Sequence, residues 1–331
     1  MADLYLAGLA ARTGSQTLSA ADAVARGAYE HARATDDGYL SVVQEPDAAP
    51  YEMAADAAKA ALAETDATPE MLIYGSIHRH GQPRFWSPAS WLQQELGMAG
   101  HIPALAIQQG CNGLMQALAM TMDLPNNGMN AALFVGADCF HKSGFDRWRS
   151  DYGLIYGDAA AAFVLSRDKG FARILETALD GVPALEVLHR DPEFASEDQS
   201  SWQTEYDIRR TKRAFLADAG TGGFAEPLVA ALERLRVKIE SHPQWRGRAD
   251  ILLTPFVGNK TRTMTYEHVF GHLATRSTWD IGQRLGHLGT TDGWVGLDHL
   301  RRTGALEPGQ HVLIVSAGVG FSCSATLLEI L

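Results

Sequence analysis

The sequence has few cysteines, no long hydrophobic run and no excess of basic residues, and each lack excludes a class of protein. The three cysteines, at positions 111, 139 and 323, are widely separated and odd in number, which argues against a disulfide framework or a zinc-binding spacing. No apolar run reaches the roughly 18 residues of a membrane span. Asp3 stands where a secretory signal carries lysine or arginine. We therefore expect a cytoplasmic protein with reduced thiols and no membrane association.

Charge and composition narrow the choice further. The chain of 331 residues has 28 Lys and Arg against 39 Asp and Glu, a net charge of −11. Nucleic-acid affinity depends on neutralising phosphates, so no nucleic-acid partner is expected, although a local basic patch for a phosphate-bearing ligand is not excluded. With 46% hydrophobic residues and no low-complexity tract, the chain is long enough for two domains or one large α/β body.

Short strand patterns alternate with amphipathic helix patterns along the chain. A helix is expected over 19–32, with Ser19 as its N-cap and Asp22 in the capping-box position, and a hairpin over 157–179 that turns at 168–170. The polar stretch 188–203 is expected to be a surface excursion. Further strands are expected at 4–10, 71–77, 103–109, 130–138, 249–256, 311–317 and 322–330, and further helices at 50–64, 88–97, 112–124, 226–240, 260–274 and 296–306. The repeated element order predicts a doubled α/β architecture with halves 1–170 and 171–331.

Cys111 lies between an apolar run and a helix pattern, in "LAIQQGCNGLMQALAM". One interpretation is a small buried hydrophobe, as free cysteines usually are. The other is a nucleophile on a strand–turn–helix elbow, where the amides at the helix start favour the thiolate. Such a thiolate can form a thioester.

A second candidate is "RLGHLGTTDGW", where His287 precedes Asp292 by five residues. A histidine can take a proton from a thiol or a hydroxyl, and a carboxylate on its other nitrogen fixes the tautomer. The alternative is that Asp292 only caps the following helix and His287 is an ordinary loop residue. Two further histidine pairs, at 78 and 80 and at 268 and 272, suggest no third ligand by their spacing, so no metal site is predicted.

The glycine-rich segment "VSAGVGFSCS" is a third candidate. Gly318 and Gly320 allow close backbone approach, and the amides of such a turn can bind an oxyanion. A bulge or tight turn between strands explains the same pattern. Arg147 and Trp148, in "FDRWRSDYG", could stack on an adenine or meet a phosphopantetheine-bearing partner, or could be surface anchors.

These segments occur together in one family. The chain resembles the β-ketoacyl-ACP synthase III branch of the thiolase superfamily in "GCNGLMQAL", in "YGDAAAAFVL" and in "EPGQHVLIVSAGVGFSCSATLL". The resemblance covers essentially the whole chain. It implies the five-layered αβαβα thiolase fold, a homodimer, and acyl transfer through a cysteine thioester, with an acyl carrier protein or coenzyme A thioester as donor and no other cofactor.

The departures from that family bear on the reaction. The family's "PHQAN" is "PFVGN" here, so Phe256 replaces the catalytic histidine while Asn259 keeps the last position. The family's "GNTSAAS" is "GHLGTTD", so His287 replaces the catalytic asparagine. Cys111, His287 and Asp292 then resemble the Cys–His–Asp triad of synthase-III-like acyltransferases of bacterial natural-product pathways.

The resemblance therefore implies a cysteine acyl-enzyme that passes its acyl group to a hydroxyl, amine or thiol in secondary metabolism, such as polyketide or antibiotic biosynthesis. By superposition of motifs, the oxyanion donors are the backbone amides of Cys111 and Val319. The residues expected to contact substrate are Phe256, Asn259, Arg147 and Trp148. The alternatives are a starter-unit synthase that performs decarboxylative condensation, a non-catalytic subunit of a heterodimer, and a thioester hydrolase.

Overall fold

A computed structural model describes residues 3–77, 85–123, 129–140, 145–190, 208–220 and 222–331. Its strands pair in the order β10-β9-β11-β12-β8-β1-β7-β6-β4-β5. The first half of the chain supplies β1 (Leu4–Thr13), β4 (Leu72–Gly75), β5 (Ala104–Ile107), β6 (Ala131–Asp138) and β7 (Ala159–Ser166). The second half supplies β8 (Ala172–Gly181), β9 (Ala249–Leu253), β10 (Ala274–Ser277), β11 (His311–Ala317) and β12 (Ser322–Ile330).

The two halves have the same strand order and the same orientations. In the first, β1 pairs antiparallel with β7 and β7 with β6, and β6, β4 and β5 are parallel. In the second, β8, β12, β11, β9 and β10 repeat that pattern in that order. The halves join where β1 pairs antiparallel with β8. The predicted division at 170/171 falls between β7 and β8. Strand pairing continues from one half to the other through β1 and β8, and a domain boundary at this point stays a prediction.

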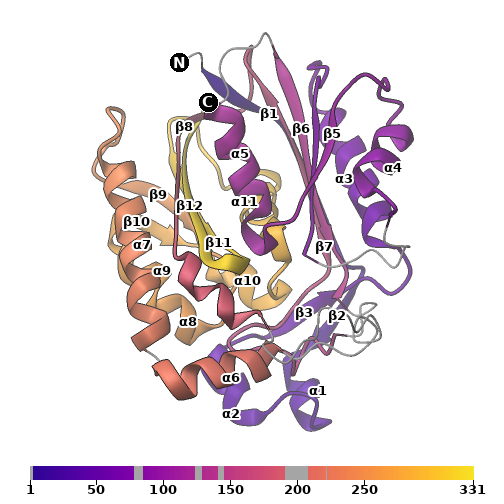
Figure 1. Ribbon diagram of the computed structural model, residues 1–331. Helices are drawn as coiled ribbons and strands as arrows, with labels where there is room; N and C mark the ends of the chain where they lie inside the picture. The colour runs from indigo at the N-terminus through magenta and orange to yellow at the C-terminus, as the bar shows by residue number, and fades with distance from the viewer. Residues whose placement is uncertain (1–2, 78–84, 124–128, 141–144, 191–207, 221) are drawn as a thin grey trace.

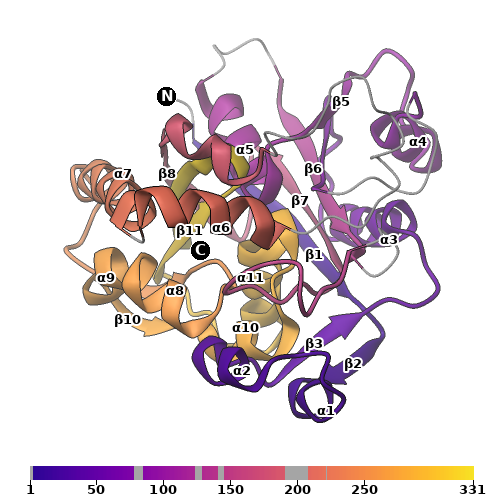
Figure 2. The same cartoon turned by 60° about the horizontal axis from the view of Figure 1, so that its bottom comes forward.

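Three layers of helices alternate with the two groups of strands, which gives the five-layered αβαβα arrangement of the thiolase fold. The central layer is α5 (Gly113–Asp123) and α11 (Asp292–Arg302), which lie between the two groups of strands and contact both (Figure 1). Outside the first half lie α3 (Pro50–Leu62) and α4 (Pro88–Glu95), and outside the second lie α7 (Gly222–Glu240) and α9 (Tyr266–Phe270), on opposite sides of the molecule (Figure 2).

Sequence explains why these segments pack as they do. Every residue of β6 and of β7 is buried, as expected for apolar strands covered on both faces. The central helices present apolar side chains to both groups of strands, and Trp294 of α11 is fully buried with its ring stacked on Phe163 at 3.9 Å between centroids. Burial of this apolar surface, aliphatic and aromatic, holds the central layer in place.

The smaller elements lie around this body. They are β2 (Gln16–Ser19), α1 (Ala20–Ala25), α2 (His31–Asp37), β3 (Ser41–Gln44), η1 (Gly110–Asn112), η3 (Pro183–Leu188), α6 (Ile208–Ala219), α8 (Asn259–Met264), η5 (Gly271–Leu273), α10 (Trp279–Leu285), η6 (Gly289–Thr291) and η7 (Val319–Phe321). The pair β2–β3 forms a separate small sheet. Of these, η1, η6 and η7 build the site described below.

Several sequence predictions are corrected by the structure. The predicted hairpin over 157–179 is wrong, because β1 lies between β7 and β8 and pairs with both. The helix predicted over 19–32 ends at Ala25, and Gly27 just after it takes a positive φ of 68°. The next helix, α2, begins at His31. Ser19 is its N-cap and accepts from the amide of Asp22. The helix predicted over 260–274 is interrupted at Thr265, which has φ −120° and ψ −79°.

Other elements had no counterpart in the sequence prediction: β2, β3, β10, α2, α6 and α10. Most of the predicted excursion 188–203, and the histidines at 78 and 80, lie outside the described residues. Within the described part of the chain, no helix has the length and apolar character needed to cross a membrane.

Candidate active site

Cys111 lies on a tight turn between an edge strand and a central helix. β5 ends at Ile107, η1 carries the cysteine, and α5 begins at Gly113. Gly110 adopts a positive φ of 53°, which only glycine takes up without strain. As a residue Cys111 is partly exposed, whereas Cys139 and Cys323 are buried. The structure therefore places Cys111 on the strand–turn–helix predicted from the sequence, at the start of a helix.

The imidazole of His287 joins this sulfur to a carboxylate. Its Nε2 atom lies 3.0 Å from Cys111 Sγ, and its Nδ1 atom lies 2.6 Å from Asp292 Oδ2. The ring is 2% exposed, and Asp292 is 6% exposed. Residues 176 positions apart in the chain are thus brought into a Cys–His–Asp array, whose geometry is that of a nucleophile, a base and a group that orients the base.

Asp292 is fixed by more than the histidine. It is the first residue of α11, and Thr291 is the N-cap. Its Oδ2 atom also accepts the amide of Phe256 at 2.8 Å, and its Oδ1 atom accepts the amide of Leu288 at 2.6 Å. Asp292 therefore does more than cap a helix, because its carboxylate joins the histidine loop to the segment after β9.

The surroundings of His287 favour a protonated ring. Burial opposes the charge and is the largest influence, but the Asp292 carboxylate and the Cys111 sulfur together outweigh it and raise the pKa of His287 well above its usual range. A proton that leaves the thiol is therefore held on the ring, beside the sulfur. By contrast, burial raises the pKa of Cys323 to about 12, so that thiol stays protonated.

The glycine turn lies directly against the nucleophile turn. It forms η7 between β11 and β12, with Gly320 at φ 75°. A Cβ atom on Gly318 would lie 2.4 Å from the amide nitrogen of Asn112, and one on Gly110 would lie 2.8 Å from the amide nitrogen of Val319. Because no side chain fits between them, the backbones of the two turns approach closely, as a paired-amide oxyanion site requires.

Loop 287–292 is seated on the nucleophile helix. Thr290 Oγ1 accepts the amide of Leu114 at 2.9 Å and so satisfies a free donor in the first turn of α5. A Cβ atom at Gly136 of β6 would lie 2.8 Å from the Thr290 methyl carbon. The loop also forms a bridge to Tyr156, whose ring lies 5.3 Å from the imidazole between centroids. These contacts fix the separation of the sulfur and the imidazole.

Two of the four residues expected to contact substrate are occupied within the protein. Arg147 is 4% exposed and forms a buried ion pair with Asp158 at 3.0 Å. Its guanidinium also donates to the carbonyls of Val43 and Tyr156. Trp148 is 7% exposed and packs on Tyr29. The structure thus differs from the expected ligand anchor at Arg147, whose side chain lies in the interior.

The other two lie after β9. The ring of Phe256 is 1% exposed and packs against Gly282 and Gly296. Asn259 is exposed at the start of α8, where its side-chain oxygen accepts a hydrogen bond from Arg262. Neither side chain takes part in the Cys111–His287–Asp292 array, and their expected role in substrate binding stays a prediction.

Sequence reasoning missed Thr290, Tyr156 and Asn112, all of which support the site. Thr290 lies within the quoted histidine loop and Asn112 directly follows the cysteine. Polar residues beside the cysteine and within the histidine loop are the signal that could have found Asn112 and Thr290. The local sequence does not indicate their partners, which come from the other half of the chain.

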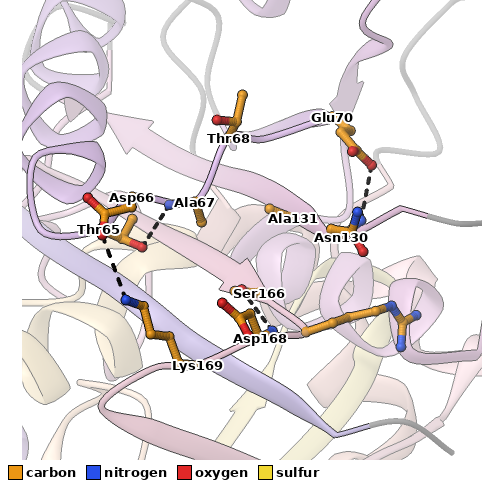
Figure 3. A pocket seen from close by; sticks show the side chains of 11 residues that line it. Thr65, Asp66, Ala67, Thr68, Glu70, Asn130, Ala131, Ser166, Asp168 and Lys169 are labelled. Atoms are coloured by element: carbon orange, nitrogen blue, oxygen red, sulfur yellow. Dashed lines mark hydrogen bonds and ion pairs between the residues drawn. The ribbon is translucent and has the colours of Figure 1, made fainter.

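A cavity of about 740 Å³ lies far from this site. It is formed by the segment before β4, the start of β6 and the end of β7 (Figure 3). Cys111 follows β5 at the opposite end of these parallel strands. Its lining carries both signs of charge, with the exposed pair Lys169–Asp66 at 3.7 Å. Among the described residues, no group of three or more His, Cys, Asp or Glu side chains is arranged to hold a metal ion.

Comparisons with known proteins place two parts of the chain beside one family of enzymes. The family model for 3-oxoacyl-acyl-carrier-protein synthase III matches residues 105–181, and the model for its C-terminal part matches residues 259–330. The β-ketoacyl-acyl-carrier-protein synthase III of Rhodospirillum rubrum is 26% identical over 302 residues, 84% of each chain.

Solved structures extend the likeness to the whole chain. The acyltransferase ChlB3 is 29% identical, with a TM-score of 0.88 over 99% of this chain and 98% of that one. The 3-oxoacyl-acyl-carrier-protein synthase III of Xanthomonas oryzae pv. oryzae has a TM-score of 0.77 at 15% identity, over 99% of this chain and 98% of that one. The synthase III of Aquifex aeolicus has a TM-score of 0.76 at 21% identity, over 98% and 99%.

Proposed function

Because the chain belongs to the synthase-III-like family of acyl-transferring enzymes, we propose that it moves an acyl group from a thioester donor, through Cys111, to a hydroxyl, amine or thiol acceptor. The observation that carries the proposal is the contact of His287 with both the Cys111 sulfur and the Asp292 carboxylate. An imidazole in that place serves the nucleophile first and the acceptor afterwards.

In the first half-reaction the donor loses its acyl group to the cysteine. The Cys111 sulfur attacks the thioester carbonyl, the S–C bond to the enzyme forms, and the negative charge on the carbonyl oxygen is received by the amides of Cys111 and Val319. The S–C bond to the donor then breaks, and the proton on His287 passes to the departing sulfur. The products are an acyl-enzyme, a free donor thiol and a neutral imidazole.

In the second half-reaction His287 acts as a base. Its Nε2 atom takes the proton of the acceptor while the acceptor atom bonds to the acyl carbon, and the S–C bond to Cys111 breaks. The sulfur leaves as a thiolate beside the newly protonated ring. Asp292 holds the ring in the required tautomer and stabilises its charge throughout, so the enzyme returns to its starting state.

Decarboxylative condensation is the second candidate, since the family includes synthases. Two hydrogen-bond donors beside the cysteine support an enolate in the synthases that the sequence resembles. Here one of those positions is Phe256, whose buried apolar ring offers no proton, and the other is His287, already engaged by Cys111 and Asp292. This favours transfer over condensation.

Intact-protein mass spectrometry tests the proposal. We expect acyl-CoA or acyl-carrier-protein thioesters to add the acyl mass to the wild-type protein and not to Cys111→Ala, with no carbon dioxide released from malonyl donors. Stoichiometric decarboxylation with a β-ketoacyl product would establish condensation instead. Thioester loss at the same rate with and without candidate acceptors would indicate a hydrolase, and full pathway function of Cys111→Ala would indicate a non-catalytic subunit.

The choice of donor and the pathway are part of the proposal. ChlB3 carries the description of an acyltransferase, and the Cys–His–Asp pattern resembles enzymes of secondary metabolism, so we infer a donor on an acyl carrier protein or coenzyme A and an acceptor made in such a pathway. Parallel mass measurements with the same acyl group on each donor distinguish the two.

We also propose a homodimer. β5 is an outer strand that pairs only with β4 among the described strands, and its Leu105 is 54% exposed, as Met120 of the neighbouring helix α5 is 56% exposed. An apolar strand edge is a template for pairing with a second chain. Light scattering after size-exclusion chromatography should show a dimer that Leu105→Glu weakens, while the equally exposed Met264→Glu leaves it intact.

A further inference from the structure

The residue after the nucleophile is a buried amide that is hydrogen-bonded at both ends. Asn112 is 0% exposed. Its Nδ2 group donates to Ser322 Oγ at 3.2 Å, and its Oδ1 atom accepts from Ser324 Oγ at 2.6 Å. Both serines belong to β12, which begins directly after the η7 turn. One side chain thus ties the nucleophile turn to the strand that anchors the opposite turn.

Other contacts at this junction are weaker guides to position. Gln109 Nε2 donates to the carbonyl of Val319 at 3.0 Å from a partly exposed side chain, and Ser316 Oγ lies 3.5 Å from the carbonyl of Cys111. The glycines at 110 and 318 permit close approach but impose no direction. Asn112 is the one buried side chain among these contacts whose two ends fix the orientation of the turn.

We propose that Asn112, held by Ser322 and Ser324, is a positioning residue that sets the separation and direction of the Cys111 and Val319 amides. The inference rests on the proposed function, in which these amides receive the oxyanion. Oxyanion donors act only when they point at the place where charge develops. A misplacement of about 1 Å can reduce the rate roughly 10²-fold, so the rotation of one turn would matter to acylation.

The side-chain type fits this role. A carboxamide offers a donor and an acceptor in one plane, and each meets a hydroxyl of the same strand two residues apart. An apolar side chain of similar size would leave the Ser324 hydroxyl, itself 0% exposed, without its acceptor. The cost of burying unpaired polar groups therefore favours the orientation seen here over a rotated turn.

Two reactions of the same sulfur provide the test. Alkylation by iodoacetamide needs the activated sulfur but forms no oxyanion. Acylation by a thioester needs the activated sulfur and also the amides that receive the oxyanion. Each rate is measured by intact mass in the wild type, Asn112→Ala and Ser324→Ala. We expect both variants to slow acylation about 10- to 100-fold and to leave the alkylation rate within about threefold.

A hydroxyl on the same strand provides the matched control. Thr326 is also buried, and its Oγ1 atom pairs with Thr177 Oγ1 at 3.0 Å, away from the turn. Thr326→Val should leave the ratio of the two rates unchanged. Equal loss of acylation and alkylation in the Asn112 and Ser324 variants, or no loss of either, would overturn the inference. If no thioester acylates the wild type, the proposed function itself fails and the inference with it.

Discussion

Replacing Asp292 by asparagine should make His287 a weaker acceptor for the proton of the Cys111 thiol, without changing the size of the side chain at position 292. The carboxylate accepts three hydrogen bonds, from His287 Nδ1 and from the amides of Phe256 and Leu288. An asparagine has one oxygen and must turn its NH₂ group toward at least one of these donors. It also removes the negative charge that raises the pKa of His287, so the ring holds a proton less strongly.

The magnitude follows from the contact that is lost. A hydrogen bond to a charged group contributes about 1.5–3 kcal/mol, and about 1.4 kcal/mol corresponds to a tenfold change in an equilibrium. We therefore expect the population with its proton on the ring to fall about 10- to 100-fold. At about pH 6, well below the ~8.5 at which an ordinary thiol ionises, alkylation of Cys111 should slow by that factor and should recover as the pH rises.

The assay is the rate of iodoacetamide labelling against pH, followed by intact mass and assigned by peptide mapping. Asp298→Asn is the matched control, because Asp298 lies on the same helix, is also mostly buried, and pairs with Arg302 at 2.8 Å rather than with the site. Thermal unfolding of both variants checks that the fold is kept. Wild-type labelling at about pH 6 by a folded Asp292→Asn protein would refute the assignment of Asp292.

Two further predictions concern Cys323 and Arg147, which lie outside the Cys111–His287–Asp292 array. In the native protein iodoacetamide should label Cys111 and spare Cys323, which is buried and whose pKa is about 12; labelling of Cys323 before urea is added would contradict this. Arg147→Met should lower the free energy of unfolding by about 3–5 kcal/mol, because the buried Asp158 carboxylate loses its opposite charge and keeps neutral donors such as the amides of Glu45 and Phe140. Urea unfolding measures that loss, and a stable variant with a raised KM for the donor would instead restore Arg147 as a substrate contact.

The parts of the molecule that the sequence predicted are those encoded within short segments. The elbow at Cys111 could be predicted because an apolar run, two glycines and a helix pattern lie within 16 residues. The histidine loop could be found because its imidazole and carboxylate are five positions apart on one turn. Their meeting across 176 residues came from the family resemblance, since no local pattern specifies which distant turns face each other.

The failures have the same cause. The predicted hairpin over 157–179 was locally reasonable, but the pairing of β1 with both flanking strands wins because it continues the sheet from one half to the other. Arg147 beside a tryptophan is typical of a surface anchor, yet the fold buries it against Asp158. An amphipathic pattern over 260–274 predicted one helix, whereas Thr265 leaves helical geometry there. Tertiary contacts decide each of these cases.

Acylation should change the histidine that promotes it. In the free enzyme burial lowers the pKa of His287, while the Asp292 carboxylate and the Cys111 sulfur raise it. Once the sulfur carries an acyl group it is a neutral thioester, so one of the two raising influences is lost while burial remains. The pKa of His287 therefore falls on acylation, and the ring becomes an acceptor for the proton of the incoming nucleophile at a pH where the free enzyme still holds that proton.

This gives a pH prediction whose sign is fixed. The transfer step needs a neutral ring, so in a single turnover of isolated acyl-enzyme the rate should rise with pH and reach its plateau below the pH at which the free enzyme loses the His287 proton. The latter is read from the imidazole signal of His287 by NMR titration, with the other histidines as internal references. A plateau for transfer at or above the titration point of the free enzyme would show that acylation leaves the ring unchanged, and the same imidazole could not then serve both half-reactions as described.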